Sequence, residues 1–214
     1  MHVRALVPLL VLANPSGTQE SSSIDLTFAQ RAFEEAQGRA KADGGELWGI
    51  ELDFPLLFVD SESRQCVANR PAAGGDAELL RREGELWVGQ YPDELYIANA
   101  TTNWAGRRWT MLVWPVPEGE LERKRLLMHE SFHNAQYKLK ISESGAPCNH
   151  LATHDGRLWL RLEVEALVQA LLHADDEREE AAADALLFRA MRRSLFAGAD
   201  ATEDGVERLE GSAE

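Results

Sequence analysis

Leu126-Leu127-Met128-His129-Glu130-Ser131-Phe132-His133-Asn134-Ala135 is the stretch that decides the fold, because it places a His-Glu-x-x-His motif in an apolar, helical setting. On a helix, His129 and His133 lie one turn apart on the same face, so both imidazoles can reach one ion. Neutral imidazole is a normal zinc ligand, and two such ligands suit half of a tetrahedral site. The stretch therefore predicts Zn²⁺ binding, against the alternative of a buried helix whose histidines bond to neighbouring side chains.

Glu130 has a different expected role from the two histidines. It is rotated by about 100° from His129 around the helix, so it cannot join the pair as a close ligand. It can instead hold a zinc-bound water and accept its proton, while the metal lowers the pKa of that water. We therefore expect Glu130 to be the catalytic base.

A catalytic zinc needs a third protein ligand and an open position. An extended motif with a third histidine would place Gly at 136 and His at 139, but the chain has Gln136 and Leu139, which excludes that pattern. Glu163 is one candidate, because its neighbours at helical spacing are apolar and a buried carboxylate is costly unless it is paired or binds metal. It would act either as the third ligand or as an acceptor that orients a ligand imidazole.

The 214 residues suit a single domain, expected over 26–214, that changes character near its middle. Residues 46–116 are rich in Trp, Tyr, Val and Ile and are broken by turns, which predicts a small, largely antiparallel sheet. Residues 117–214 read as helices. Strands first and helices afterwards indicate an α+β fold. The expected strands are 47–52, 55–60, 65–70, 85–90, 94–99 and 107–116, and the expected helices are 26–42, 118–140, 156–174, 176–196 and 202–214.

The amino-terminal residues suggest export. Residues 1–13 hold one arginine followed by a short apolar run, with Val11 and Ala13 small enough for the positions before a secretory cleavage site. We expect a signal peptide over 1–13, a polar leader over 14–25 and an exported chain. The alternative is a buried first strand in a cytoplasmic protein. No run of about 20 apolar residues is present, so no membrane span is expected in the mature chain.

The charge of the chain disfavours one class of partner, and its cysteine content excludes one class of metal site. The chain has 22 Lys and Arg against 36 Asp and Glu, a net charge of −14, which disfavours nucleic acid as a partner. Two cysteines, Cys66 and Cys148, exclude a four-cysteine zinc site and leave one disulfide open.

A second motif lies at the end of the sequence, Glu210-Gly211-Ser212-Ala213-Glu214. It resembles the Glu-Gly-x-Ala motif that carries the third zinc ligand of gluzincin metallopeptidases. The resemblance implies that Glu210 is the third ligand, and we prefer it to Glu163 on that ground. Leu209 departs from the usual polar residue, and the sequence stops before the tyrosine that commonly follows, which suggests a truncated or diverged motif.

The resemblance extends over most of residues 40–214. Segments 104–111 (WAGRRWTM) and 150–159 (HLATHDGRLW) are similar to stretches found in bacterial gluzincin-like proteins. The resemblance implies a zincin-like fold in which residues 107–114 form the strand that faces an extended peptide substrate.

Four further residues are candidates for stabilising the oxyanion of a tetrahedral intermediate: His150, His154, Tyr137 and Arg157. The leading functional hypothesis is a zinc-dependent hydrolase, a metallopeptidase acting on peptides or proteins through Glu130. The alternative is a non-catalytic zincin-like binding or structural module that holds metal weakly or not at all.

Overall fold

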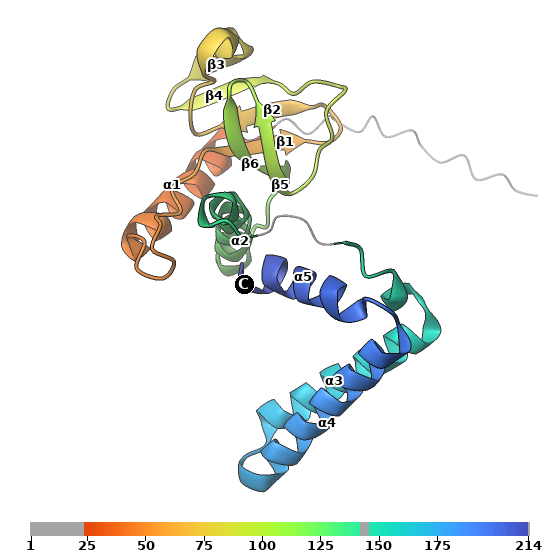
Figure 1. Ribbon diagram of the computed structural model, residues 1–214. Coiled ribbons are helices and arrows are strands. Elements are labelled where there is room, and N and C mark those ends of the chain that lie inside the picture. Colours follow the sequence, from red (N-terminus) through yellow and green to blue (C-terminus); the bar gives the residue numbers. More distant parts are fainter. Residues whose placement is uncertain (1–23, 142–145, 214) are drawn as a thin grey trace, which may run out of the picture.

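The computed structural model describes residues 24–141 and 146–213 (Figure 1). A six-stranded mixed sheet is followed by a helical carboxy-terminal half, which confirms the predicted α+β class. The expected signal peptide, residues 1–13, lies outside the described part. No described helix is both long enough and apolar enough to cross a membrane.

The sheet has the strand order β3-β4-β2-β1-β6-β5. Four of its five pairings are antiparallel, and the pairing of β1 with β6 is parallel. The strands are β1 (Leu56–Asp60), β2 (Gln65–Ala68), β3 (Leu80–Glu83), β4 (Leu86–Gln90), β5 (Ala100–Trp104) and β6 (Arg107–Trp114). β3 and β5 are therefore the two edges.

Both faces of the sheet are covered, which explains the continuous apolar run of β1. Side chains alternate along a strand, so Leu56 and Phe58 point to one face while Leu57 and Val59 point to the other. The first face packs against helices α1 (Leu26–Asp43) and α2 (Glu120–Leu139). Phe33 of α1 stacks on Phe58 with ring centroids 4.3 Å apart. The second face packs against the segment that joins β4 to β5.

The folded part begins earlier than predicted. Ile24, expected in the polar leader, is buried at 3% exposure and donates its backbone N–H to the side chain of Gln65. Asp25 caps α1, since its carboxylate accepts hydrogen bonds from the backbone N–H groups of Thr27 and Phe28. The domain therefore includes both residues.

Two expected strands are wrong, and two strands were not predicted. Residues 47–52 form turns around Gly49, which has a φ of +68°. The side chains of Trp48, Ile50 and Leu52 pack against α2 instead of joining the sheet. Residues 94–99 are irregular, and the Leu95 carbonyl accepts a hydrogen bond from Arg64 instead of from a neighbouring strand. The strands that lacked a clear apolar alternation are the edges, β3 and β5, whose sequences are LRRE and ATTNW.

The helical half contains α2 and then α3 (His154–Leu172), α4 (Asp175–Leu195) and α5 (Ala199–Gly211). α2 lies against the sheet, with contacts to β5, β6 and α1. α3 and α4 pack on each other as a hairpin that projects away from the sheet, and α5 leads back from the base of that hairpin to α2 (Figure 1).

The two cysteines do not form a disulfide with each other, since Cys66 is a buried free thiol and Cys148 is a free thiol too.

Candidate metal centre

Polar contacts inside the interface of α2 with the sheet fix the rotation of α2. Asn134 is 3% exposed, and its amide nitrogen lies 3.2 Å from the Thr110 hydroxyl on β6. Arg108, on the same strand, donates from Nε to Asn134 Oδ1 at 3.1 Å. Leu127 and Phe132 anchor the same helix in two apolar clusters. With this face turned inward, His129 and His133 lie half-buried on the side that meets α5.

His129, His133 and Glu210 converge on one point. The two Nε2 atoms are 3.1 Å apart, and Glu210 Oε2 lies 3.3 Å from Nε2 of His129 and 3.5 Å from Nε2 of His133. These ligand atoms all lie within 4.8 Å of one another, a separation that a single ion between them would bridge. The rings of His129 and His133 meet edge to face, with centroids 4.7 Å apart.

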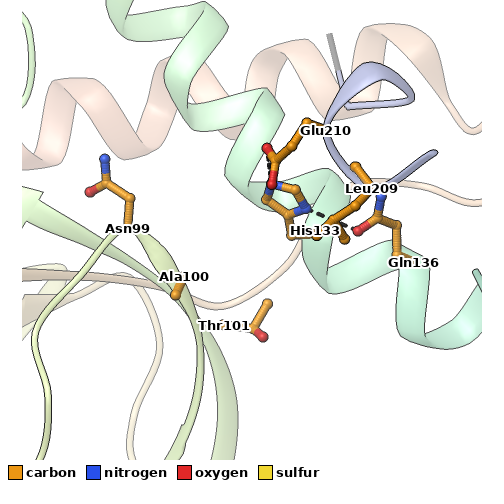
Figure 2. Close-up of a pocket in the computed structure, with 7 residues that line it drawn as sticks. All are labelled: Asn99, Ala100, Thr101, His133, Gln136, Leu209 and Glu210. Atoms are coloured by element: carbon orange, nitrogen blue, oxygen red, sulfur yellow. Dashed lines mark hydrogen bonds and ion pairs between the residues drawn. The ribbon is translucent and has the colours of Figure 1, made fainter. Parts of the chain in front are cut away.

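Gln136 joins the two helices of this cluster, and its role was not predicted from the sequence. Its Oε1 lies 2.9 Å from His133 Nδ1, and its Nε2 donates to the Leu209 carbonyl at 2.6 Å (Figure 2). The same Nε2 also reaches the Ser212 hydroxyl at 3.2 Å. With Nδ1–H donating to Gln136, His133 keeps its Nε2 lone pair for a ligand. The signal was available in the spacing, because a residue three positions after a helical histidine lies within reach of its ring.

Glu130 is buried beside the two histidines. Its residue exposure is 6%, and no described residue makes a hydrogen bond to its Oε2 atom. Burial raises the pKa of the Glu130 carboxyl above its ordinary value, while His133 and His129 act in the opposite direction. A buried carboxylate oxygen without a partner is unusual, so this atom is available to accept a proton or a hydrogen bond from a bound molecule.

Residues of the cluster line two cavities. One, of about 190 Å³, is lined by His133, Gln136, Glu210 and residues 99–101 at the start of β5 (Figure 2). Another, of about 300 Å³, is lined by residues of α2 that include His129 and Glu130. The strand facing the site at an open edge is therefore β5. The expectation for residues 107–114 is wrong, because β6 is paired on both sides, with β1 and β5.

Glu163 is not placed as a metal ligand. It is 3% exposed, and its carboxylate accepts hydrogen bonds from Arg189 and Arg192 of α4. The prediction that this carboxylate is buried was right, but two arginines on the neighbouring helix, and not a metal ion, compensate its negative charge. The sequence position of Glu163 alone could not distinguish arginine from metal as the partner.

Arg192 is the centre of a buried charge cluster. Its guanidinium is 2% exposed and also donates to both carboxylate oxygens of Glu203 on α5, at 2.7 and 2.9 Å. Arg193 donates to the same carboxylate at 2.8 Å. The cluster ties α5, the helix that carries Glu210, to the base of the α3–α4 hairpin.

The four oxyanion candidates lie outside the lining of both cavities. His150 Nε2 is 2.7 Å from Glu203 Oε1, so this ring belongs to the charge cluster. His154 is exposed beside Asp155, and the Arg157 guanidinium bonds to the Ala152 carbonyl. Tyr137 is 64% exposed, with the Arg108 guanidinium 4.9 Å from its ring centroid. None of these placements supports an oxyanion role.

Comparisons with protein-family models, with curated proteins and with solved structures found no match for this chain. The functional assignment therefore rests on the geometry of the cluster and on the chemistry of its side chains.

Proposed function

We propose that this chain is a zinc-dependent peptidase with a zincin-like fold. The observation that carries the proposal is the convergence of two imidazoles and a carboxylate beside a buried, unpartnered carboxylate oxygen. His129, His133 and Glu210 would hold the ion. Glu130 would act as general base.

The donor set fits zinc. Two neutral imidazoles and one carboxylate form a common catalytic zinc site, which leaves a fourth position for a reacting molecule. The hydrogen bond between His133 Nδ1 and Gln136 orients one ligand ring. A bound Zn²⁺ would act as a Lewis acid and would bring the pKa of a coordinated water toward neutrality.

The protein supplies proton transfer through Glu130. Its free carboxylate oxygen accepts a proton from the water that attacks the peptide carbonyl carbon. The same oxygen then delivers that proton to the amine nitrogen as the carbon–nitrogen bond breaks. Burial suits this cycle, because raising the pKa of the carboxyl brings it closer to that of the groups with which it exchanges protons.

The open edge of β5 supports a peptide as the substrate. Residues at the start of β5 line the cavity that also contains His133 and Glu210. An edge strand has unpaired backbone N–H and C=O groups, and an extended peptide binds such an edge by forming another strand. A peptide bound there would pass beside the ligand cluster.

The test measures zinc content and peptide hydrolysis separately. His133→Ala and Glu210→Gln should lose the metal, whereas Glu130→Gln and Glu163→Gln should keep wild-type zinc content by elemental analysis. Hydrolysis of a mixed peptide library, followed by mass spectrometry, should fall by about 10²–10⁴-fold in Glu130→Gln, as is typical for the loss of a general base.

Glu120→Gln is the matched control, because Glu120 lies on the first turn of the same helix and pairs with Lys124 at the surface. It should change neither zinc content nor hydrolysis. The proposal would be refuted if the wild type failed to take up zinc. Full activity in a zinc-loaded Glu130→Gln variant would remove Glu130 from the mechanism.

One observation favours a second function, a non-catalytic zincin-like module that holds metal weakly. The Glu210 side chain is 50% exposed, so solvent competes with the ion for this carboxylate. Zinc-loaded wild type with no cleavage of any library peptide would select this second function.

A further inference from the structure

Helix α5 carries Glu210, the third member of the candidate metal centre, but it buries very little of its own surface. Of its 13 residues, only Ala199 and Glu203 are buried, and both lie in its first two turns. Apolar burial is the main force that usually holds a helix against its domain, and here it contributes little. The position of α5 must therefore depend on polar contacts.

One set of polar contacts lies at the start of α5 and centres on Glu203. Arg192 donates to both oxygens of this carboxylate, at 2.7 and 2.9 Å, and Arg193 donates to it at 2.8 Å. His150 Nε2 lies 2.7 Å from Oε1 of the same carboxylate. Both arginines belong to α4, and His150 precedes α3. Glu203 therefore joins α5 to the base of the α3–α4 hairpin.

The other set of polar contacts lies where α5 ends. Gln136 of α2 donates to the Leu209 carbonyl at 2.6 Å, which keeps this end beside the helix that carries the two histidines. α5 thus spans from the hairpin to α2 and is held at both ends (Figure 1). The direction in which it arrives at α2 is determined by the contacts at its start.

Three carboxylates occupy one face of α5. Glu207 and Glu210 follow Glu203 by four and seven residues, so they are rotated from it by only about 40° and about 20° around the helix. Glu207 pairs with Arg189 of α4 at 3.0 Å. No arginine or lysine in the described part of the chain pairs with Glu210, whose carboxylate faces the imidazoles of α2 instead. The first two carboxylates are thus compensated by α4, and the third is directed at the candidate metal centre.

We propose that Glu203 is a positioning residue for the metal centre. It lies two turns, or about 10 Å, before Glu210 on the same helix face, so fixing its carboxylate fixes the rotation and the height of Glu210. A change in rotation by one residue, about 100°, would turn Glu210 away from the imidazoles. The inference rests on the proposed function, since it concerns the same ion, and it makes the α3–α4 hairpin a support for the centre.

The hairpin keeps ion pairs of its own that do not involve Glu203. Arg189 and Arg192 also donate to Glu163 of α3, so the pairs that join α3 to α4 remain when Glu203 loses its charge. Loss of that charge should therefore loosen α5 and leave the hairpin paired. If α5 is docked in only about a tenth of the molecules, the apparent affinity for the ion falls about tenfold, because only the docked form supplies all three ligands.

The test compares Glu203→Gln with Glu207→Gln in the full chain. Both variants remove one negative charge from the same face of α5, so any general electrostatic effect on cation binding is matched. Glu207 is closer to Glu210 in the sequence, but its side chain is 47% exposed, and exposed ion pairs contribute little. In a competition with a chromophoric chelator, Glu203→Gln should bind Zn²⁺ at least about tenfold more weakly than the wild type, and Glu207→Gln should stay within about threefold of it.

Amide hydrogen exchange of the metal-free proteins separates positioning from general stability. In Glu203→Gln the amides of α5 should exchange faster, while those of α2, α3 and α4 keep wild-type rates. Faster exchange throughout α3 and α4, or a Zn²⁺ affinity no lower than that of Glu207→Gln, would overturn the inference and leave the proposed function standing. A wild type that takes up no Zn²⁺ would overturn the proposed function, and the inference with it.

Discussion

Replacing Arg192 by methionine removes the cation that Glu163 and Glu203 share. Methionine keeps much of the length and apolar volume of the arginine stem but donates no hydrogen bond. In the wild type the guanidinium bonds to both carboxylates, and all three residues are at most 5% exposed. The variant would therefore leave two buried carboxylates facing each other with fewer donors.

The expected loss of stability can be derived in two ways. Removing one partner of a buried ion pair typically costs about 3–5 kcal/mol. Independently, burial acts to raise the pKa of Glu203, but hydrogen bonds from Arg192, Arg193 and His150 outweigh it and lower the pKa from 4.5 to about 2. At about 1.4 kcal/mol per pKa unit, this shift corresponds to about 3 kcal/mol near neutral pH, which is an upper bound for the loss through Glu203, since Arg193 and His150 remain in the variant.

The pH dependence follows from the direction of that shift. Because the pKa of Glu203 is lower in the folded state, its contribution is fully present above pH 4.5 and disappears as the pH falls from 4.5 toward about 2. Arg192→Met removes the largest of the influences that lower this pKa. The variant should therefore lose less additional stability on acidification than the wild type.

Urea unfolding followed by far-ultraviolet circular dichroism, at neutral pH and at several acidic values, measures both effects. Arg178→Met is the control, because Arg178 is an exposed arginine of the same helix. It should change the free energy of unfolding by less than about 1 kcal/mol. The reasoning would be refuted if Arg192→Met cost no more than the control, or if its free energy of unfolding fell with acid as steeply as that of the wild type.

Two further predictions concern Gln136 and the cysteines. Gln136→Ala should lower zinc affinity by about 10- to 100-fold with little change in helix content, since the variant loses the contacts to His133 and Leu209. Competition with a chromophoric chelator measures the affinity, and an unchanged value would contradict the role of Gln136 in positioning His133. In the folded protein Cys148 should react with a thiol reagent while Cys66 does not, because burial raises the pKa of the Cys66 thiol to about 12. Mass spectrometry of the labelled peptides checks this, and rapid labelling of Cys66 would contradict the prediction.

The features that could be predicted from the sequence are those with local periodicity. Leu56 to Val59 form a continuous apolar run that indicates a strand buried on both faces, and the spacing of His129 and His133 places two imidazoles on one side of a helix. Such patterns depend on neighbouring residues alone.

The features that could not be predicted depend on distant partners. Glu163 has the pattern of a buried carboxylate, but only the packing of α4 shows that arginines compensate for it. β5 has no apolar alternation to indicate a strand, because it lies at the edge of the sheet and its side chains are mostly half-exposed. The proximity of Glu210 to the histidines was suggested by a resemblance and is visible only once α5 returns to α2.

The hydrogen bond between Gln136 and the Leu209 carbonyl joins residues that are 73 positions apart, so the chain leaves α2 and comes back to the same helix. Everything between, including the α3–α4 hairpin, is a loop whose closure costs conformational entropy that grows only slowly with its length. An ion held by His133 and Glu210 would link the two ends of that loop. By linkage, it would stabilise the hairpin and α5 together against unfolding, and any change that stabilised this segment against unfolding would in turn favour the ion-bound form.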